Sequence, residues 1–159
     1  MKDVVEPARI PDDVAEVREL FREYAASLGF DLDFQGFEAE LARLPGEYTA
    51  PDGVLLVARR DEVCVGCIGV RRLADDVCEM KRLYVRPSAR GGKLGRRLAE
   101  ASIAEACDLG YRAMRLDTVP WMHEAIGLYE SLGFVRIAPY RHNPIEGAVY
   151  MELGLTSCE

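Results

Sequence analysis

The sequence has no apolar run that approaches the roughly 18 residues needed to span a membrane as a helix. Residues 1–13, MKDVVEPARIPDD, lack the apolar stretch of a signal peptide. The chain also lacks the basic excess typical of nucleic-acid binders, since 27 acidic residues against 20 basic ones give a net charge of −7. We therefore expect a cytoplasmic protein whose partners are neither membranes nor nucleic acids.

Few residues are suited to binding a metal ion. The two histidines, His123 and His142, lie outside any catalytic motif and are expected at the surface. Cys64 and Cys67 form a CxxC motif, but no second CxxC or HxxxH completes a four-ligand site. The segment VCVGCIGV is typical of a buried strand, in which these two cysteines would face opposite sides. We predict no metal site.

Apolar periodicity predicts one mixed α/β domain over residues 1–159. The predicted helices cover residues 11–29, 36–44, 92–109 and 121–133. The predicted strands cover residues 4–10, 54–60, 63–73, 77–85, 111–119, 134–140 and 147–155. Short connections between the strands at 54–85 predict antiparallel hairpins, and the strand–helix–strand order over 77–118 predicts a parallel pair.

Residues 90–96, RGGKLGR, form a glycine-rich segment between a predicted strand and a predicted helix. Such a segment can bind an anion, because glycine permits close backbone approach and a helix N-terminus offers unpaired N–H groups. It is not an ATP-type P-loop, since leucine replaces the Ser or Thr that should follow GK. The glycine spacing is also wrong for a dinucleotide site. A phosphate site and a plain strand-to-helix turn both remain open.

Two motifs occur in order, LYVRPSARGGKLGRRLAEASIAEA over residues 83–106 and HEAIGLYESLGF over 123–134. Together they resemble the GNAT superfamily of acyl-CoA-dependent N-acyltransferases. That family has an apolar strand ending in V-x-P, then R/Q-x-x-G-x-G/A opening a long helix, and later A-x-x-L-Y-x-x-x-G-F. The resemblance covers nearly the whole chain. It implies a single-domain α/β fold with a mixed, mostly antiparallel sheet flanked by helices and a V-shaped splay between two central parallel strands.

The resemblance implies acetyl-CoA as the cosubstrate, with no metal. Its pantetheine arm would pair with the strand backbone at Leu83, Tyr84 and Val85. The pyrophosphate would be bound by the loop residues Arg90, Gly91, Gly92, Lys93, Leu94, Gly95 and Arg96. Two positions depart from the family pattern: Lys93 replaces a usual glycine, and Met122 replaces an asparagine that often contacts the cofactor arm.

The resemblance also implies two catalytic residues. Tyr129 matches the tyrosine near the thioester sulfur, where a phenol can protonate the departing thiolate. Outside its motif, Tyr129 would be taken for a buried packing residue. Glu79 matches a glutamate that removes the amine proton through water, and partial burial would raise its pKa. The alternatives for Glu79 are an ion pair with Lys81 or Arg82, or an exposed strand position.

The activity implied is transfer of an acetyl group to a primary amine of a small molecule, by direct attack in a ternary complex. The segments at 29–35 and 139–147 would form two walls of the acceptor site, with Arg141 able to bind a carboxylate. Both segments could equally be ordinary surface loops. A protein or peptide N-acetyltransferase and a non-catalytic acyl-CoA-binding module are the alternatives. The resemblance also allows a homodimer.

Overall fold

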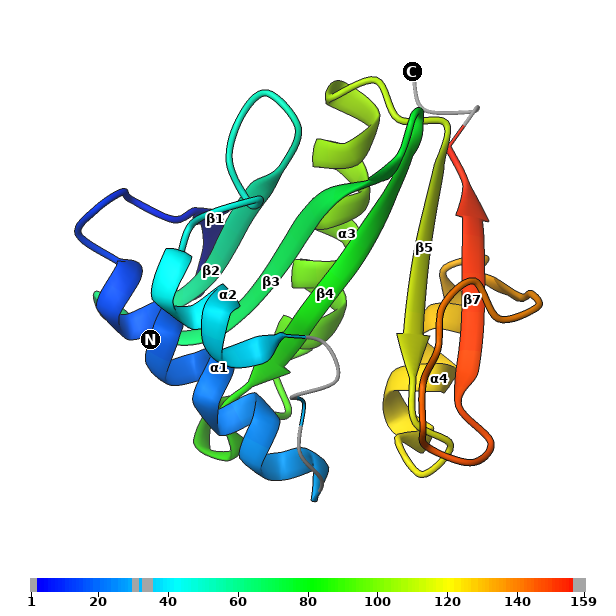
Figure 1. The fold of residues 1–159 in the computed structure, drawn as a ribbon. Helices are drawn as coiled ribbons and strands as arrows, with labels where there is room; N and C mark the ends of the chain where they lie inside the picture. Colours follow the sequence, from blue (N-terminus) through cyan, green and yellow to red (C-terminus); the bar gives the residue numbers. More distant parts are fainter. Residues whose placement is uncertain (1–2, 30–31, 33–35, 156–159) are drawn as a thin grey trace.

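The structure is a computed structural model that describes residues 3–29, 32 and 36–155. A seven-stranded sheet in the order β1-β2-β3-β4-β5-β7-β6 has helices on both faces (Figure 1). The strands are β1 (Asp3–Pro7), β2 (Val54–Arg60), β3 (Val63–Ala74), β4 (Val77–Val85), β5 (Ala113–Thr118), β6 (Val135–Arg136) and β7 (Val149–Gly154). The helices are α1 (Val14–Leu28), α2 (Phe37–Arg43), the 3-10 turn η2 (Pro87–Ala89), α3 (Leu94–Asp108) and α4 (His123–Ser131).

The sheet is mixed and mostly antiparallel, as the sequence predicts. Strands β2, β3 and β4 form two antiparallel hairpins, and β4 pairs with β5 in parallel after the crossover through α3. The bounds of β2 and β4 coincide with the predicted strands at 54–60 and 77–85. The last strand in the chain, β7, lies between β5 and β6.

Most elements are shorter by a few residues than their predicted ranges, and two of these differences have a clear physical reason. The strand predicted at 134–140 reduces to β6, although the Ile137 N–H still donates to the Tyr150 carbonyl at 2.9 Å. Pro139 follows soon after and has no N–H for a ladder bond. The helix predicted from residue 92 begins at Leu94, because Lys93 adopts the left-handed conformation with φ of 61°.

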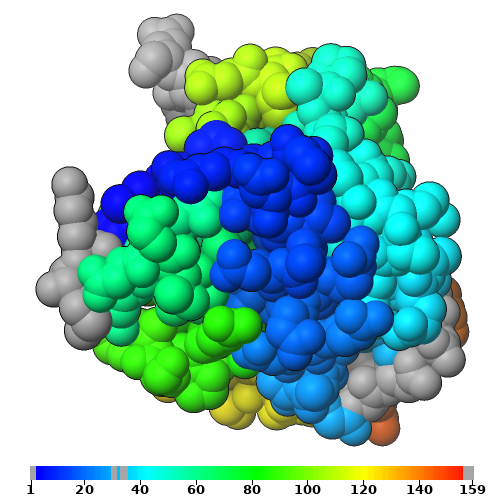
Figure 2. Space-filling view, turned by 90° about the vertical axis from the view of Figure 1, so that its left-hand side faces the viewer, coloured from blue at the N-terminus to red at the C-terminus, as the bar shows by residue number. Residues whose placement is uncertain are grey.

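The sheet separates two hydrophobic clusters. One cluster packs α1 and α2 against β2 and β3, and Figure 2 shows α1 (blue) in the middle of this side of the molecule with α2 (cyan) beside it. The other cluster packs α3 and α4 against the opposite face (Figure 1). Fully buried members include Leu20, Phe21 and Val57 in the first cluster, and Leu98 and Met114 in the second. No helix in the described part of the chain is long and apolar enough to cross a membrane.

The expectation that Cys64 and Cys67 face opposite sides of β3 is wrong. Both side chains are free, buried and part of the cluster under α1 and α2. The register between β2 and β3 shifts after Ala58, leaving Val65 without a pairing partner in β2. A β-bulge of this kind inserts one residue and reverses the alternation of faces beyond it. Cys158 and the predicted connector at 30–35, apart from Leu32, lie outside the described residues.

Candidate functional site

The parallel strands β4 and β5 pair only at their N-terminal ends. Their paired residues run from Val77 with Ala113 to Glu79 with Arg115, and the strands then diverge (Figure 1). Strand β5 instead remains paired with β7 along its full length. Residues 80–85 therefore present an edge to β5 that has no strand partner in the described part of the chain. This is the splay that the sequence resemblance implied.

A bulge in β4 shapes this open edge. The register between β3 and β4 shifts between Cys67 and Gly69, and Arg82 has a φ of 62°. A residue with a Cβ in the left-handed region is strained unless its surroundings hold it there. The buried Arg82 side chain donates to both carboxylate oxygens of Glu40 at 2.8 and 3.0 Å, and it lies 5.1 Å from the Phe37 ring centroid. These contacts with α2 hold the bulge in place.

A cleft of about 280 Å³ opens beside the C-terminal end of β4. It lies among α1, the end of β4, the glycine loop and α4. Its lining comprises Tyr24, Ser27, Leu83, Tyr84, Val85, Arg90, Gly91, Lys93, Leu94, Gly95, Met122, Glu124, Ala125 and Leu128. The structure thus brings together the predicted strand residues and all of the predicted loop residues except Gly92 and Arg96.

The geometry of the loop fits an anion such as a pyrophosphate. Gly91 has a φ of 102°, a conformation that residues with a Cβ rarely adopt. A Cβ placed at Gly91 or at Gly95 would meet nothing within 4 Å, so the backbone borders open space. Helix α3 follows with no side-chain cap on its N-terminus. Its unpaired first-turn N–H groups and positive dipole end therefore favour a bound anion.

The two arginines that flank the loop are engaged within the protein. Arg96 donates to Ser131 Oγ at 2.9 Å and forms an ion pair with Glu100 at 3.4 Å. Arg90 donates to the Val85 carbonyl at 2.9 Å, which fixes the turn after β4. The geometry thus favours backbone N–H groups as the main anion ligands, and a direct phosphate contact from Arg96 stays a prediction.

A smaller cavity of about 40 Å³ lies where β4 and β5 diverge. Its lining comprises Tyr24, Met80, Lys81, Arg82, Leu83, Leu116, Asp117, Thr118, Met122, Ala125 and Tyr129. Because Leu83 and Met122 line both this cavity and the larger cleft, the two spaces adjoin. Tyr129 is 7% exposed, and burial raises the pKa of its phenol. The phenol therefore stays protonated and available as a donor.

Glu79 is the second predicted catalytic residue, and its surroundings differ from those expected. Its side chain is fully buried and lines neither cavity. It accepts hydrogen bonds from Arg71 at 3.1 Å and Tyr140 at 2.8 Å, and it forms an ion pair with Arg141. Burial would raise its pKa, but Lys81, Arg141 and Arg71 outweigh that effect and lower it. The expected rise in the pKa of Glu79 is therefore wrong.

The sequence predicts for Lys81 only an ion pair with Glu79. The structure places it in the smaller cavity with Tyr129 and Asp117, and its side chain is 5% exposed. Burial and the nearby Arg82 charge lower the pKa of Lys81 to about 7. No sequence signal indicated this, because the environment is built from β4, β5 and α4 together.

Comparison with known proteins identifies the family. The sequence profile described as the Acetyltransferase (GNAT) family matches residues 14–134. The chain belongs to this family. An uncharacterized N-acetyltransferase of Schizosaccharomyces pombe is 41% identical over 154 residues, covering 96% of this chain and 94% of that protein.

Solved structures agree in fold. An acetyltransferase from Streptococcus agalactiae superposes with a TM-score of 0.78 at 21% identity, covering 96% of this chain and 98% of that one. YncA from Salmonella typhimurium, solved with its cofactor acetyl-CoA, gives a TM-score of 0.69 at 23% identity over 98% and 95% of the two chains. The protein is thus an acyltransferase of the GNAT family with the corresponding fold.

The expected acceptor walls of this GNAT protein are only partly described. Most of the segment at 29–35 lies outside the described residues. In the segment at 139–147, Asn143 donates to the Asp117 carboxylate at 3.3 Å. Arg141 is already paired with Glu79, although its buried Nε has no hydrogen-bond partner. The structure therefore pairs Arg141 with Glu79, a carboxylate that it shares with Arg71.

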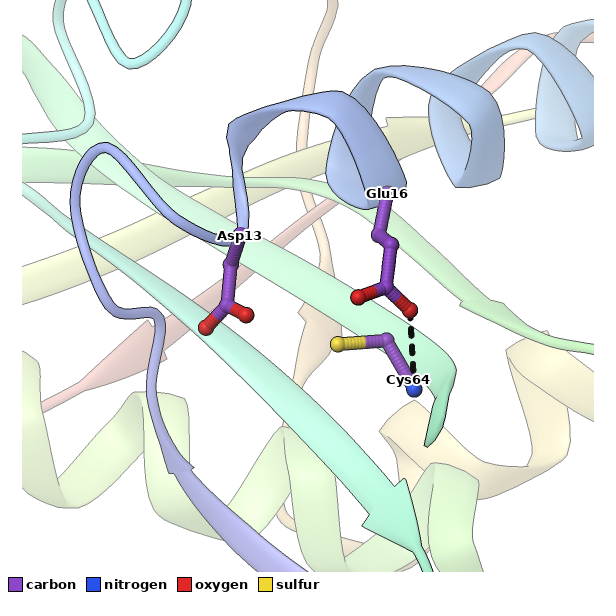
Figure 3. Close-up of side chains that lie close together, drawn as sticks. All are labelled: Asp13, Glu16 and Cys64. Atoms are coloured by element: carbon purple, nitrogen blue, oxygen red, sulfur yellow. Dashed lines mark hydrogen bonds between the residues drawn. The ribbon is translucent and has the colours of Figure 1, made fainter. Parts of the chain in front are cut away.

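A separate cluster at the start of α1 resembles a metal site in composition. The ligand atoms of Asp13, Glu16 and Cys64 lie within 4.8 Å of one another (Figure 3). However, the Arg59 guanidinium donates to Asp13 at 3.0 Å and contacts Cys64 Sγ at 3.4 Å. Burial also raises the pKa of the Cys64 thiol to about 11. Because arginine already supplies the positive charge, we interpret the cluster as structural.

Proposed function

We propose that this GNAT protein transfers an acetyl group from acetyl-CoA to a primary amine of a small molecule. One acyltransferase domain would span the chain and bind both substrates before direct attack of the amine on the thioester. The observation that carries the proposal is that the two cavities adjoin and share the lining residues Leu83 and Met122. An elongated donor held at the glycine loop would run along the cleft and bring its reactive end to Tyr129.

The residues of the cleft supply what binding of such a donor requires. The loop at 90–95 and the N-terminus of α3 offer backbone N–H groups to the pyrophosphate. The unpaired edge of β4 at Leu83, Tyr84 and Val85 offers backbone groups to the amide bonds of the pantetheine arm. Met122 lines the cleft where the family often has asparagine, so its side chain supplies apolar contact.

Tyr129 would protonate the departing sulfur. Its phenol lies in the small cavity at the inner end of the cleft, and its raised pKa keeps the proton in place until sulfur carries negative charge. Glu79 lines neither cavity, so we propose that it holds Arg71 and Arg141 in position and contributes its charge to the site. The proposed acceptor is a small molecule, because the reaction would occur in a cavity of only about 40 Å³ between two strands.

Thermal melting with acetyl-CoA tests donor binding. A ligand at 100 times its dissociation constant should stabilise the protein by about 2.7 kcal/mol and raise its melting temperature. ADP and NAD serve as controls for general nucleotide binding. Equal shifts with all three ligands, or no shift with acetyl-CoA, would contradict the proposal.

Tyr129→Phe tests turnover against a panel of small amines. We expect acetyl transfer to fall about 100-fold or more, the usual effect of removing a general acid, while the shift with acetyl-CoA is retained. Tyr111→Phe is the matched control, because the Tyr111 hydroxyl bonds the Asp52 carbonyl and lines neither cavity. Donor binding without transfer by the unmodified protein would favour the non-catalytic module, and transfer only to peptides would favour a peptide acetyltransferase.

A further inference from the structure

We propose that Lys81, rather than Glu79, is the general base that removes a proton from the acceptor amine. This inference rests on the proposed acetyl transfer and adds a catalytic residue to it. Lys81 lines the same cavity as Tyr129, whereas Glu79 does not line that cavity.

The position of Lys81 in the fold suits a base. It lies on β4 two residues after Glu79, the last residue that pairs with β5, so it is at the point where the strands diverge. The residue that follows, Arg82, forms the bulge that bends the edge of β4. Across the gap, Asp117 and Thr118 at the end of β5 line the same cavity. An amine that reaches Tyr129 would therefore pass beside Lys81.

Glu79 cannot readily take this role. Arg71, Arg141 and Tyr140 occupy its carboxylate oxygens, and its side chain is fully buried. The lowered pKa makes it a weak base as well. Protonating Glu79 would remove the buried negative charge that pairs with the Arg71 and Arg141 guanidinium groups, which is costly. The negative charge of Glu79 instead raises the pKa of Lys81 and so partly offsets the lowering by Arg82 and Arg71.

The electrostatic surroundings leave much of the Lys81 population uncharged near neutral pH. Burial is the main cause, followed by repulsion from Arg82 and Arg71, while Glu79 and Asp117 act in the opposite direction. The titratable and charged groups around Lys81 are Glu79 and Arg82 on β4, Arg71 on β3, Asp117 on β5, Glu40 on α2, Tyr24 on α1 and Tyr129 on α4. A base with a pKa of about 7 is well matched to work at neutral pH.

The proton balance of the reaction closes with these groups. The acceptor ammonium gives one proton to the neutral amine of Lys81, and its freed lone pair forms the C–N bond as the C–S bond breaks. The departing sulfur takes a proton from the phenol of Tyr129, and the second amine proton restores that phenol. Lys81 then releases its proton to solvent, so one proton is liberated for each acetyl group transferred.

The experiment compares two acceptors of similar shape. One is an alkylamine that the unmodified protein acetylates in the panel of small amines, and the other is the corresponding hydrazide. The alkylamine is protonated at neutral pH and needs a base, whereas the hydrazide is already uncharged. Lys81→Met should lower kcat/KM for the alkylamine by about 100- to 10,000-fold, the range typical of a lost general base, and affect the hydrazide far less. Equal losses with both acceptors would show a structural role and overturn the proposal.

Two further variants separate proton transfer from charge. Lys81→Arg keeps a positive charge but cannot lose it, so it should be as impaired with the alkylamine as Lys81→Met. Lys93→Met is the matched control. We expect it to weaken binding of acetyl-CoA while kcat/KM for the alkylamine still falls as the pH drops below about 7, as in the unmodified protein. Full activity of Lys81→Arg would overturn the proposal.

Two outcomes distinguish this inference from the proposed function. If the unmodified protein binds no acetyl-CoA and acetylates no amine, the proposed function fails and this inference fails with it. If transfer occurs while mass spectrometry finds Lys81 acetylated on every molecule of a working enzyme, the base proposal alone is overturned, because an acetylated lysine cannot accept a proton. Retention of the acetyl-CoA melting shift in Lys81→Met confirms that the variant is folded and binds its donor.

Discussion

Two arginine–carboxylate clusters in this protein are each centred on one buried side chain, and the two central side chains, Arg59 and Glu79, have opposite charge. In the Arg59 cluster, one guanidinium serves two carboxylates, Glu6 and Asp13. In the Glu79 cluster, the Glu79 carboxylate pairs with two guanidinium groups, those of Arg71 and Arg141, and Arg71 also pairs with the exposed Glu47 at 2.9 Å. The first joins β1, β2 and the start of α1, and the second lies beside the diverging strands.

The two clusters differ in how they affect the pKa values of their members and neighbours. Hydrogen bonding to Arg59 lowers the pKa of both Glu6 and Asp13, so neither titrates near neutral pH. Beside the Glu79 cluster, burial and the Arg82 charge lower the pKa of Lys81 to about 7, while Glu79 raises it and Arg71 lowers it. The Arg59 cluster therefore stabilises the fold, whereas the Glu79 cluster also adjusts the pKa of a neighbouring buried lysine.

The largest effect is expected from Glu79→Gln. Removing one partner of a buried ion pair typically costs about 3–5 kcal/mol of unfolding free energy, and here Arg141 loses its carboxylate partner while Arg71 keeps only Glu47. Because Glu79 raises the pKa of Lys81, its loss should also shift the acidic limb of kcat/KM to lower pH. Denaturant unfolding and a pH–rate profile measure the two effects. An unchanged limb would contradict the coupling to Lys81.

Asp13→Asn is the counterpart in the Arg59 cluster. We expect a loss of about 1–3 kcal/mol, smaller than for Glu79→Gln because Arg59 keeps Glu6 as a partner. Since the folded-state pKa of Asp13 is lowered, its contribution is present above its ordinary pKa of 3.8 and is lost as the pH falls through the folded-state value. Denaturant unfolding at several pH values measures this. If Asp13→Asn also changed the pH dependence of kcat/KM, the Arg59 cluster would affect the reaction as well as the stability of the fold.

Lys81→Met should stabilise the protein at neutral pH while it impairs transfer to the alkylamine. The folded state depresses the pKa of Lys81 from 10.5 to about 7, so burial of the ammonium destabilises the fold fully below pH 7 and progressively less between pH 7 and 10.5. One pKa unit corresponds to about 1.4 kcal/mol, so we expect a gain on the order of a few kcal/mol. The gain should decline as the pH rises from 7 toward 10.5. Melting temperatures across this range measure it, and a constant gain would indicate packing alone.

The smallest effect is expected from Arg71→Met. Arg71 lowers the pKa of Lys81, so its removal should move the acidic limb of kcat/KM to higher pH, opposite to Glu79→Gln. The shift should be modest, because burial and Arg82 remain. A shift in the same direction for both variants would show that the charges of the Glu79 cluster do not set the pKa of Lys81.

The sequence by itself determined the local elements and the two motif segments. Strands at 54–60 and 77–85 follow directly from their apolar patterns, and the glycine loop lies where a strand gives way to a helix. The motif around Tyr129 located the phenol that the structure places at the inner end of the cleft. These features depend on residues close in the chain, so periodicity and spacing reveal them.

Only the tertiary structure decided how the charged residues work. The bulges at Val65 and Arg82 arise from strand pairing, which a pattern of period two does not reveal. The partners of Glu79 come from β3 and from the segment at 139–147, so its pKa falls where the sequence suggested a rise. Lys81 acquires its lowered pKa from burial and from charges on several elements. Electrostatic energies depend on distance and desolvation in space, and the order of residues in the chain specifies neither.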